Sequence, residues 1–268
     1  MWHQYPMVAF DLETTGVDVE TDRIVTAAVI SIGFGITTQT HEWLADPGIE
    51  IPAGASEIHG ITTEHARQHG EPARQVVDQI TEALVVRVQL GNPIIGHNLT
   101  YDLTLLDREC RRHQLVPLLD RLEGAPLRVL DTRVLDQYGL PFRKRPSETQ
   151  GARQLITLAH VYDLPWDAEA AHGCSYDALM AARILYRIGS LAHMRRMDWP
   201  ERIKFHRKAQ LHHLEGLSLD ELHARQIVWA AEQAAGLQEY FRKTDPDAVV
   251  DGSWPFRPVA AIAAAEEA

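Results

Sequence analysis

The sequence predicts an α/β fold in which a mixed sheet of five strands is covered by helices on both faces. Three strand-like runs come first, and strand and helix patterns then alternate along the chain. Beyond Leu191 the pattern is only helical. We therefore expect a domain over residues 1–191, a helical appendage over residues 192–244, and an extended or flexible tail over residues 245–268.

The first three strands are predicted over 7–12, 24–35 and 37–44, because these runs are apolar or rich in β-branched residues. A Pro- and Gly-rich loop follows. Apolar residues then recur at helical spacing from Val76 to Val88, with Pro72 suited to the first turn. This segment is predicted to be a crossover helix.

Short strands and helices alternate after the crossover. In order, we predict a strand over 93–96, a helix over 100–113, a strand over 128–130, and helices over 150–162, 176–188 and 200–213. A last helix begins at Ser218, where Glu221 completes a capping box. In the tail, Trp254 and Phe256 are the apolar residues expected to dock.

Composition excludes several classes of protein. Of the 268 residues, 45% are hydrophobic and 24% are charged, which is ordinary for a globular chain. A net charge of −11 argues against a protein that coats nucleic acid over its whole surface. The two cysteines form no CxxC pair, no signal peptide is visible, and no apolar run is long enough to span a membrane. We expect a soluble, cytoplasmic protein without membrane contact.

Asp11 and Glu13 leave the end of the first predicted strand with a spacing of two, so their side chains share one face. They lie at the carboxyl edge of the sheet, where open α/β sheets place ligands. A solvated strand end is the competing interpretation for such a pair taken alone.

A second group lies at the next junction between a strand and a helix. Asn98 and Asp102 are four residues apart, and Thr100 between them is placed to cap the helix. Simple helix capping is the alternative interpretation of these residues.

A third group precedes the helix predicted over 176–188. His172 stands five residues before Asp177, Gly173 allows a tight turn, and Ser175 is predicted to be the N-cap. Asp177 is therefore expected in the first helical turn, whereas His172 alone is typical of a surface loop.

Together these residues resemble the DEDDh family of 3′ to 5′ exonucleases. Asp-Leu-Glu-Thr-Thr-Gly at 11–16 is similar to the family's first motif, 97–102 to the second, and 172–177 to the third. His-Gly-Ile-Thr at 59–62 and Leu-Asp-Thr at 130–132 also resemble segments of that family. The C-terminal helices lie outside the resemblance.

The resemblance implies a ribonuclease-H-like fold and two divalent cations, Mg²⁺ or Mn²⁺, whose charge balances the acids. By this resemblance Asp11 bridges both ions, Glu13 and Asp177 complete one site, and Asp102 holds the other largely through water. His172 is the expected general base. The implied products are nucleoside 5′-monophosphates.

The resemblance also suggests a substrate-binding set of Thr14, His59, Ile61 and Asn98 around the terminal nucleotide, with Ile61 as a wedge against its base. Thr14 as a strand-end cap and Ile61 as an ordinary packing residue are the alternatives. The expected partner is the 3′ end of a nucleic acid, taken to be single-stranded DNA, although the shared chemistry acts equally on RNA.

Two basic stretches are candidates for phosphate contact. One is the loop 143–145, and the other is 195–208, which holds six bases and two acids. Solvated bases are the alternative in both cases. The segment 210–214 faintly resembles a sliding-clamp peptide, but a helix surface is favoured there.

Two other functions remain open. The chain could be a nuclease-fold scaffold that has lost catalysis, although four intact acids argue against it. It could also be a proofreading subunit that docks on a polymerase or another replication partner through its C-terminal helices.

Overall fold

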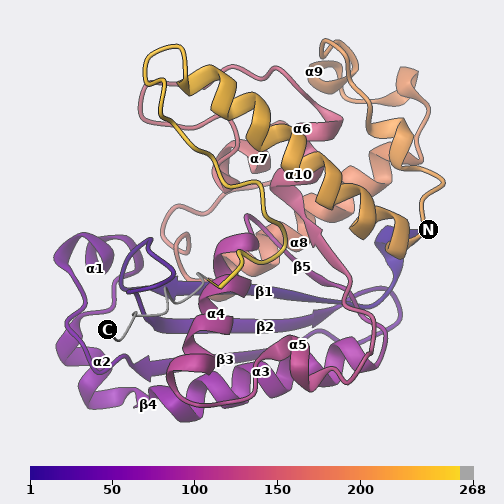
Figure 1. Cartoon of the computed structure of the whole chain (residues 1–268). Coiled ribbons are helices and arrows are strands. Elements are labelled where there is room, and N and C mark those ends of the chain that lie inside the picture. Colours follow the sequence, from indigo (N-terminus) through magenta and orange to yellow (C-terminus); the bar gives the residue numbers. More distant parts are fainter. Residues whose placement is uncertain (260–268) are drawn as a thin grey trace, which may run out of the picture.

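A computed structural model describes residues 1–259 of the chain. Its centre is a mixed sheet with the strand order β4-β3-β2-β1-β5-β6 (Figure 1). Strands β1, β2 and β3 form an antiparallel meander, whereas β5 is parallel to β1 and β6 is parallel to β5. The strands are β1 (Met7–Thr14), β2 (Ile24–Ile32), β3 (Gln39–Asp46), β4 (Glu71–Pro72), β5 (Ile94–Gly96) and β6 (Val129–Asp131).

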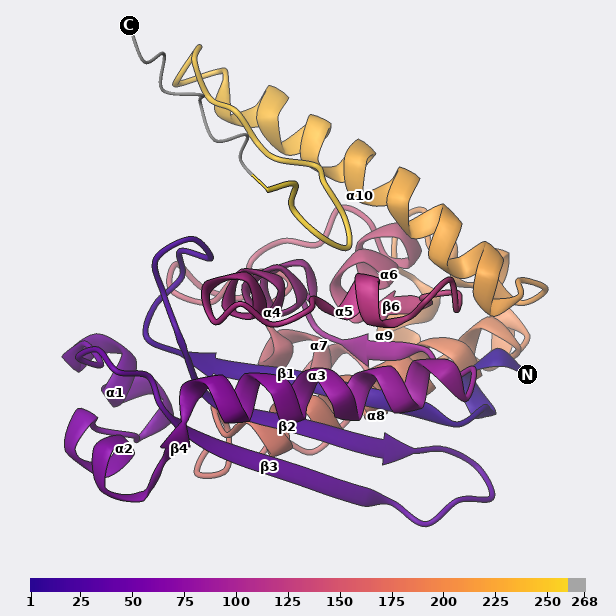
Figure 2. The same ribbon diagram turned by 60° about the horizontal axis from the view of Figure 1, so that its bottom comes forward.

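Helices cover both faces of this sheet. Helix α8 packs against β1, β2 and β5 on one face, and α3 and α4 lie on the other (Figures 1 and 2). The α-helices are α1 (Ala53–His59), α2 (Thr63–His69), α3 (Ala73–Gln89), α4 (Thr100–Arg112), α5 (Leu118–Arg121), α6 (Thr132–Gly139), α7 (Leu155–Val161), α8 (Cys174–Ala192), α9 (Glu201–Lys204) and α10 (Leu219–Phe241). Short 3₁₀ turns span Trp2–Gln4, Arg196–Asp198 and Leu211–Leu214. The predicted fold class is confirmed. Within the described residues, no helix has the length and hydropathy needed to cross a membrane.

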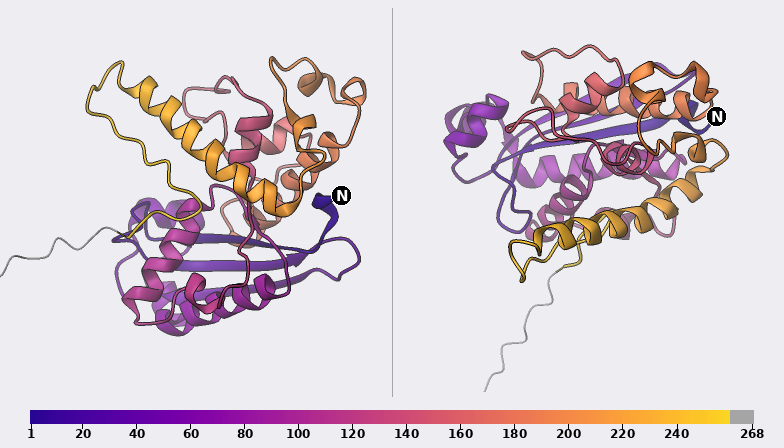
Figure 3. Two further views of the ribbon diagram at one scale, coloured as in Figure 1. Left: turned by 45° about the vertical axis from the view of Figure 1, so that its right-hand side comes forward. Right: turned by 90° about the horizontal axis from the view of Figure 1, so that it is seen from above.

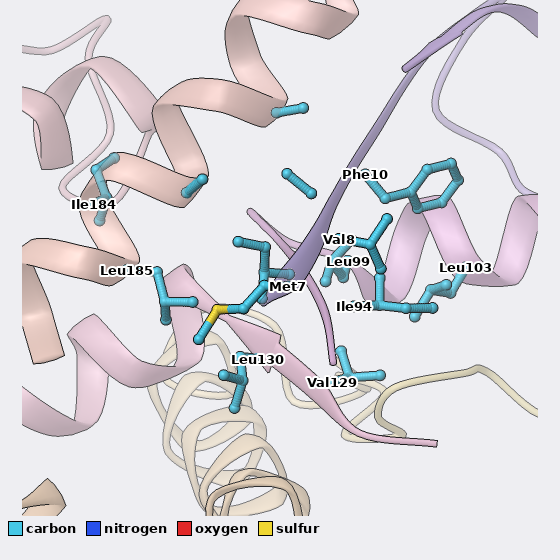
Figure 4. Close-up of a cluster of buried hydrophobic side chains, with 14 of the residues drawn as sticks. Met7, Val8, Phe10, Ile94, Leu99, Leu103, Val129, Leu130, Ile184 and Leu185 are labelled. Atoms are coloured by element: carbon cyan, nitrogen blue, oxygen red, sulfur yellow. The ribbon is translucent and has the colours of Figure 1, made fainter. Parts of the chain in front are cut away.

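The side chains of β1 point alternately to the two faces of the sheet, so this strand contacts the helices on both faces. Figure 4 shows Val8 and Phe10 beside Leu103 of α4, while Met7 points toward Leu185 of α8. All five side chains are buried. Odd-numbered residues of β1 therefore face α8, and even-numbered residues face α4.

Several predicted elements differ from the structure. The sheet has a sixth strand, because the two residues of β4 pair with the end of β3. The helix predicted over 150–162 begins only at Leu155, and α1, α2 and α6 were not predicted. The helix predicted over 200–213 is wrong: α9 ends at Lys204, and the backbone of Lys208 has a left-handed φ of 56°, which a continuous helix cannot contain.

Helix α10 begins at the predicted capping box of Ser218 and Glu221. It runs along the outside of the molecule beside α6 and β6 (Figure 3). Its fully buried Gln226 completes the edge of β6: the side-chain amide donates to the Val129 carbonyl at 2.9 Å, and its oxygen accepts from the Asp131 N–H at 2.8 Å. The helix therefore provides hydrogen-bond partners for the outer edge of β6, which is paired with β5 on its other side.

The chain after α10 returns to α4. Trp254 is buried and Phe256 is partly buried, as predicted. Arg108 of α4 donates to the Pro258 carbonyl at 2.7 Å, and Thr104 accepts from the Arg257 N–H at 2.9 Å. The rest of the predicted tail, residues 260–268, lies outside the described residues, and the division into domain, appendage and tail stays a prediction.

We predict that Gln226→Leu lowers the free energy of unfolding by about 1–3 kcal/mol, because it leaves buried backbone groups of β6 without partners. Urea unfolding followed by circular dichroism measures this loss. Arg225→Leu, at the neighbouring exposed position, is the control and should change stability by less than about 0.5 kcal/mol. Equal losses in the two variants would contradict a special role for Gln226.

Candidate metal centre and active site

Asp11 and Glu13 lie on β1, on the face that looks toward α8. They pair in register with Ala28 and Thr26 of β2, so the strand is fixed where it carries them. The register shifts directly after Glu13, which ends regular pairing at Thr14. The two carboxylates therefore project from the last regularly paired residues of β1, at the strand end that the sequence predicts.

Asp177 completes a cluster with these two acids. Carboxylate oxygens of Asp11, Glu13 and Asp177 all lie within 4.8 Å of one another, the only such group found in residues 1–259. Asp177 lies in the first turn of α8, whose N-cap is Gly173 and not the predicted Ser175. Its Oδ1 atom is buried and has no hydrogen-bond partner within the described structure.

Asp102 lies beside this cluster but outside it. It is buried in the first turn of α4, and its Oδ1 accepts from the Leu12 N–H at 3.1 Å. That bond fixes Asp102 between Asp11 and Glu13 along the strand. The predicted cap Thr100 is instead the first helical residue, and Leu99 occupies the N-cap without a side-chain bond.

The electrostatics of the four acids are unfavourable without a cation. Burial raises the pKa of Asp11 well above its usual range, and Asp102, Asp177 and Glu13 raise it further. Burial, with the charges of Asp177 and Asp102, raises the pKa of Glu13 to about 8. Burial likewise raises the pKa of Asp102, to about 7, although the Leu12 N–H opposes the shift. Such shifts arise where like charges converge in a low dielectric.

The donor set fits a hard divalent cation. All of its atoms are carboxylate oxygens, the ligands that Mg²⁺ and Mn²⁺ prefer. The orphaned Oδ1 of Asp177 is aimed at no other group of the described protein, and a bound cation would supply its missing partner.

His172 lies in the exposed loop just before α8 and has a left-handed backbone, with φ of 64°. Burial raises the pKa of Asp177, and the charge of His172 and its backbone hydrogen bond partly oppose that rise. The structure thus brings His172 next to one acid of the cluster while leaving its side chain open to solvent.

The loop that leads to Asp102 is fixed by a carboxylate whose role the sequence did not reveal. Asp131, at the end of β6, accepts from the N–H groups of Asn98 and Leu99, each at 2.9 Å, and also caps α6. Asn98 has a left-handed φ of 64°, and its side-chain oxygen accepts from Arg133. The sequence showed Asp131 only as an acidic strand end, because its partners lie 32 and 33 residues away.

A second buried carboxylate anchors the loop that follows α6. Asp136 is fully buried and binds Arg143 at 2.6 Å and Arg153 at 3.3 Å. The Arg153 carbonyl lies 3.0 Å from Nε2 of His97, the first residue of the second predicted motif. The expectation that Arg143 contacts phosphate is wrong, because its guanidinium is committed to Asp136. Lys144 and Arg145 are exposed.

Thr14 and its neighbours form a small polar network at the end of β1. The Thr14 hydroxyl donates to the Gly16 carbonyl at 2.6 Å and lies 2.8 Å from the Tyr101 hydroxyl. Tyr101 also donates to Gly16, at 2.5 Å. The strand-end interpretation of Thr14 is therefore supported, and Tyr101 is a neighbour that the sequence did not single out.

The other two expected substrate residues lie at the end of α1. Nδ1 of His59 accepts from the Ile61 N–H at 3.2 Å, whereas its Nε2 atom is buried without a partner within residues 1–259. Burial lowers the pKa of His59, and the nearby polar backbone of Thr14 opposes the shift, so His59 lies beside the end of β1. Ile61 is partly buried against Val25 and Ile51. Its packing role is thus present, and its role as a wedge stays a prediction.

The structure does not support the roles expected for parts of the two C-terminal segments, 195–208 and 210–214. Leu211 and Leu214 are fully buried, so the 210–214 segment offers neither the predicted helix surface nor a free clamp peptide. In the basic stretch 195–208, Arg195 is bound to Asp198 and Arg202 to the His160 carbonyl. These two bases are used within the fold.

Comparison with known proteins identifies the class to which this fold and site belong. Residues 8–185 match the model of the family RNase_T, described as Exonuclease, and the chain is a member of that family. The matched range contains all four acids and His172.

Among the similar curated proteins is the DNA polymerase III PolC-type of Streptococcus agalactiae serotype III. It is 27% identical over 186 residues, which are 68% of this chain but 12% of the polymerase. The Streptococcus thermophilus enzyme of the same type (strain LMD-9) is 30% identical over 122 residues, 44% of this chain and 8% of that one. The chain therefore corresponds to a small part of these polymerases.

Among solved structures, Escherichia coli Exonuclease I in complex with a dT13 oligonucleotide superposes with a TM-score of 0.58 at 18% identity, covering 72% of this chain and 45% of that one. The product-bound structure of exonuclease I gives 0.57, covering 70% and 44%. The ribonuclease-H-like fold that the motifs predict is confirmed by this likeness.

The raised pKa of Glu13 predicts that the metal-free protein loses stability as pH rises. The unfolded chain releases this proton near 4.5, whereas the folded protein keeps it until about pH 8. Between these values the folded state binds more protons, so the free energy of unfolding falls with rising pH. Urea unfolding in EDTA from about pH 5 to pH 8 measures the slope, which Mg²⁺ should offset by binding the deprotonated acids. In Glu13→Gln the slope should be flatter, and an unchanged slope in that variant would count against this account.

Proposed function

We propose that the protein is a metal-dependent 3′ to 5′ exonuclease that hydrolyses single-stranded DNA and releases nucleoside 5′-monophosphates. The observation that carries the proposal is the cluster of Asp11, Glu13 and Asp177, with Asp102 beside it, inside the range of an exonuclease family. The DNA preference is supported by the relatives, which are DNA polymerases and an exonuclease solved with a dT13 oligonucleotide. The direction is supported by the resemblance of the three motifs to the DEDDh family.

In this proposal two divalent cations, Mg²⁺ or Mn²⁺, would be held by Asp11, Glu13 and Asp177 together with Asp102 beside them. The bond from the Leu12 N–H to Oδ1 of Asp102 would keep that carboxylate in place. When bound, such cations stabilise the attacking and the leaving oxygens of an in-line displacement at phosphorus.

His172 accepts the proton of the attacking water. The water oxygen bonds to the terminal phosphorus and the bond from phosphorus to the 3′ oxygen breaks. The 3′ oxygen stays with the shortened strand and takes a proton from solvent water to become a hydroxyl. The exposed position of His172 lets it exchange this proton with solvent after each turnover. Thr14, His59, Ile61 and Asn98 are the residues proposed around the terminal nucleotide.

A proofreading role beside a polymerase is the second candidate. It is favoured by the curated relatives, in which the corresponding region is part of a DNA polymerase. A scaffold without catalysis is disfavoured, because four converging acids with raised pKa values cost stability and serve no purpose without cations.

We expect wild-type protein to shorten single-stranded DNA with a free 3′ end in Mg²⁺ or Mn²⁺, and to leave a 3′-blocked strand intact. Matched RNA, and a primer with a mispaired 3′ end, test the sugar preference and the proofreading role in the same assay.

Asp11→Ala should abolish turnover and melt no lower than wild type in EDTA, because it also removes like-charge repulsion. Degradation of 3′-blocked strands would contradict the proposed direction, and an active Asp11→Ala variant would contradict the site.

His172→Ala should lower the rate about 10²- to 10⁴-fold, the scale of a general base, without weakening Mg²⁺ binding. Wild type should lose activity as the pH falls, because a protonated base cannot accept the proton of the attacking water. The rate against pH, measured at saturating Mg²⁺, checks both expectations. His172→Ala should lack that acidic limb, and a variant that retained it would exclude His172 as the base.

A further inference from the structure

An exposed surface outside the carboxylate site combines aromatic rings with positive charge. We name it the basic-aromatic surface. It comprises Phe142, Lys144, Arg145, Phe205, Arg207 and Lys208. Phe142 is 69% exposed and Phe205 is 76% exposed, which is unusual for phenylalanine.

Two segments distant in sequence meet to form this surface. The N–H of Gln210 donates to the Gly139 carbonyl at 2.7 Å, which holds the chain after α9 against the end of α6. The Lys208 ammonium lies 5.3 Å from the centre of the Phe142 ring. The cation therefore covers one face of an exposed ring, and both are displayed together.

The charges on this surface are not neutralised by acidic side chains of the described protein. Within residues 1–259, none of Lys144, Arg145, Arg207 and Lys208 forms an ion pair with a carboxylate, whereas neighbouring Arg143 does. These four exposed charges lie on two short segments, 142–145 and 205–208, which the contact between Lys208 and Phe142 brings together in a chain with a net charge of −11. Such a local concentration is complementary to a polyanion.

The aromatic rings narrow the choice of polyanion. Proteins that bind single strands combine bases, which contact the phosphates, with exposed aromatic rings, on which unpaired nucleobases stack. A duplex offers its phosphates but keeps its bases stacked on one another. Exposed Phe142 and Phe205 therefore favour a single strand.

We propose that the basic-aromatic surface binds single-stranded nucleic acid upstream of the 3′ end, with nucleobases on Phe142 and Phe205 and phosphates on the four bases. This inference rests on the proposed function, because it takes the 3′ end to lie at the carboxylates. The loop that carries Phe142 continues to Arg153, whose carbonyl bonds to His97 of the second motif. A hydrogen bond thus connects the loop that carries part of the surface to the second motif of the carboxylate site.

The test measures binding of labelled oligothymidylates of increasing length in Ca²⁺, which should allow binding without turnover. Wild-type affinity should increase once the strand is long enough to reach the surface. Phe142→Ala/Phe205→Ala should weaken binding of long strands at least about fivefold. Replacing Lys144, Arg145, Arg207 and Lys208 by Gln should reduce the logarithmic salt slope by about 0.7 for each phosphate that the variant no longer binds.

Matched controls separate this surface from general effects. Phe34→Ala removes a phenylalanine that is 84% exposed in the turn after β2. A second control replaces four exposed bases elsewhere by Gln, namely Arg74, Arg183, Arg225 and Lys243. Both controls should bind long strands like wild type, and all variants should hydrolyse a dinucleotide at the wild-type rate in Mg²⁺.

Wild-type affinity in the surface variants, or equal weakening in the controls, would overturn the inference. Failure of the proposed function looks different, because wild type would then release no nucleotide from a dinucleotide or from any longer strand.

Discussion

Mutual repulsion among four partly or fully buried carboxylates is the constraint on which the rest of this structure depends. Asp11, Glu13, Asp102 and Asp177 come from β1, α4 and α8, and burial raises the pKa of each. Flexible segments would relieve this repulsion by moving apart. The acids stay together because β1 is paired with β2 along its length and with β5 at Val8 and Ala9, and because the strand packs against α8 and α3. The bond from the Leu12 N–H to Asp102 adds α4 to this framework. A rigid core is therefore a condition for the site.

The loops around the acids are held by other carboxylates that are satisfied. Asp131 receives three backbone N–H groups, and Asp136 binds Arg143, Arg153 and the Tyr162 hydroxyl. Buried ion pairs are weak evidence for stability, but their directional bonds determine geometry. The acids of the proposed metal site differ from Asp131 and Asp136. Asp11, Glu13 and Asp177 converge on one another, and Oδ1 of Asp177 has no hydrogen-bond partner within residues 1–259.

The sequence could predict the three strands of the meander, α8 and the last capping box, because each depends on a local pattern of residues. It could also predict that the acids group together, because they belong to recognisable motifs. The broken helix after Pro200 could not, because its apolar residues keep helical spacing while Lys208 takes a left-handed conformation. The predicted cap at Ser175 is wrong by two residues, because helix ends shift by one or two residues without changing the pattern. Asp131 was missed as a loop anchor because its partners are distant in sequence.

The bonds between Gln226 and β6 have a consequence for folding during synthesis. Asp131, which fixes the loop before α4, has its own N–H bound by a residue 95 positions later. Trp2 likewise donates its ring N–H to the Leu214 carbonyl, 212 positions away. Contacts of such separation close large loops, which has an entropic cost. During synthesis on the ribosome, the Asp131 N–H gains this partner only after Gln226 has emerged, so a chain that ends before α10 leaves this edge of β6 without that bond.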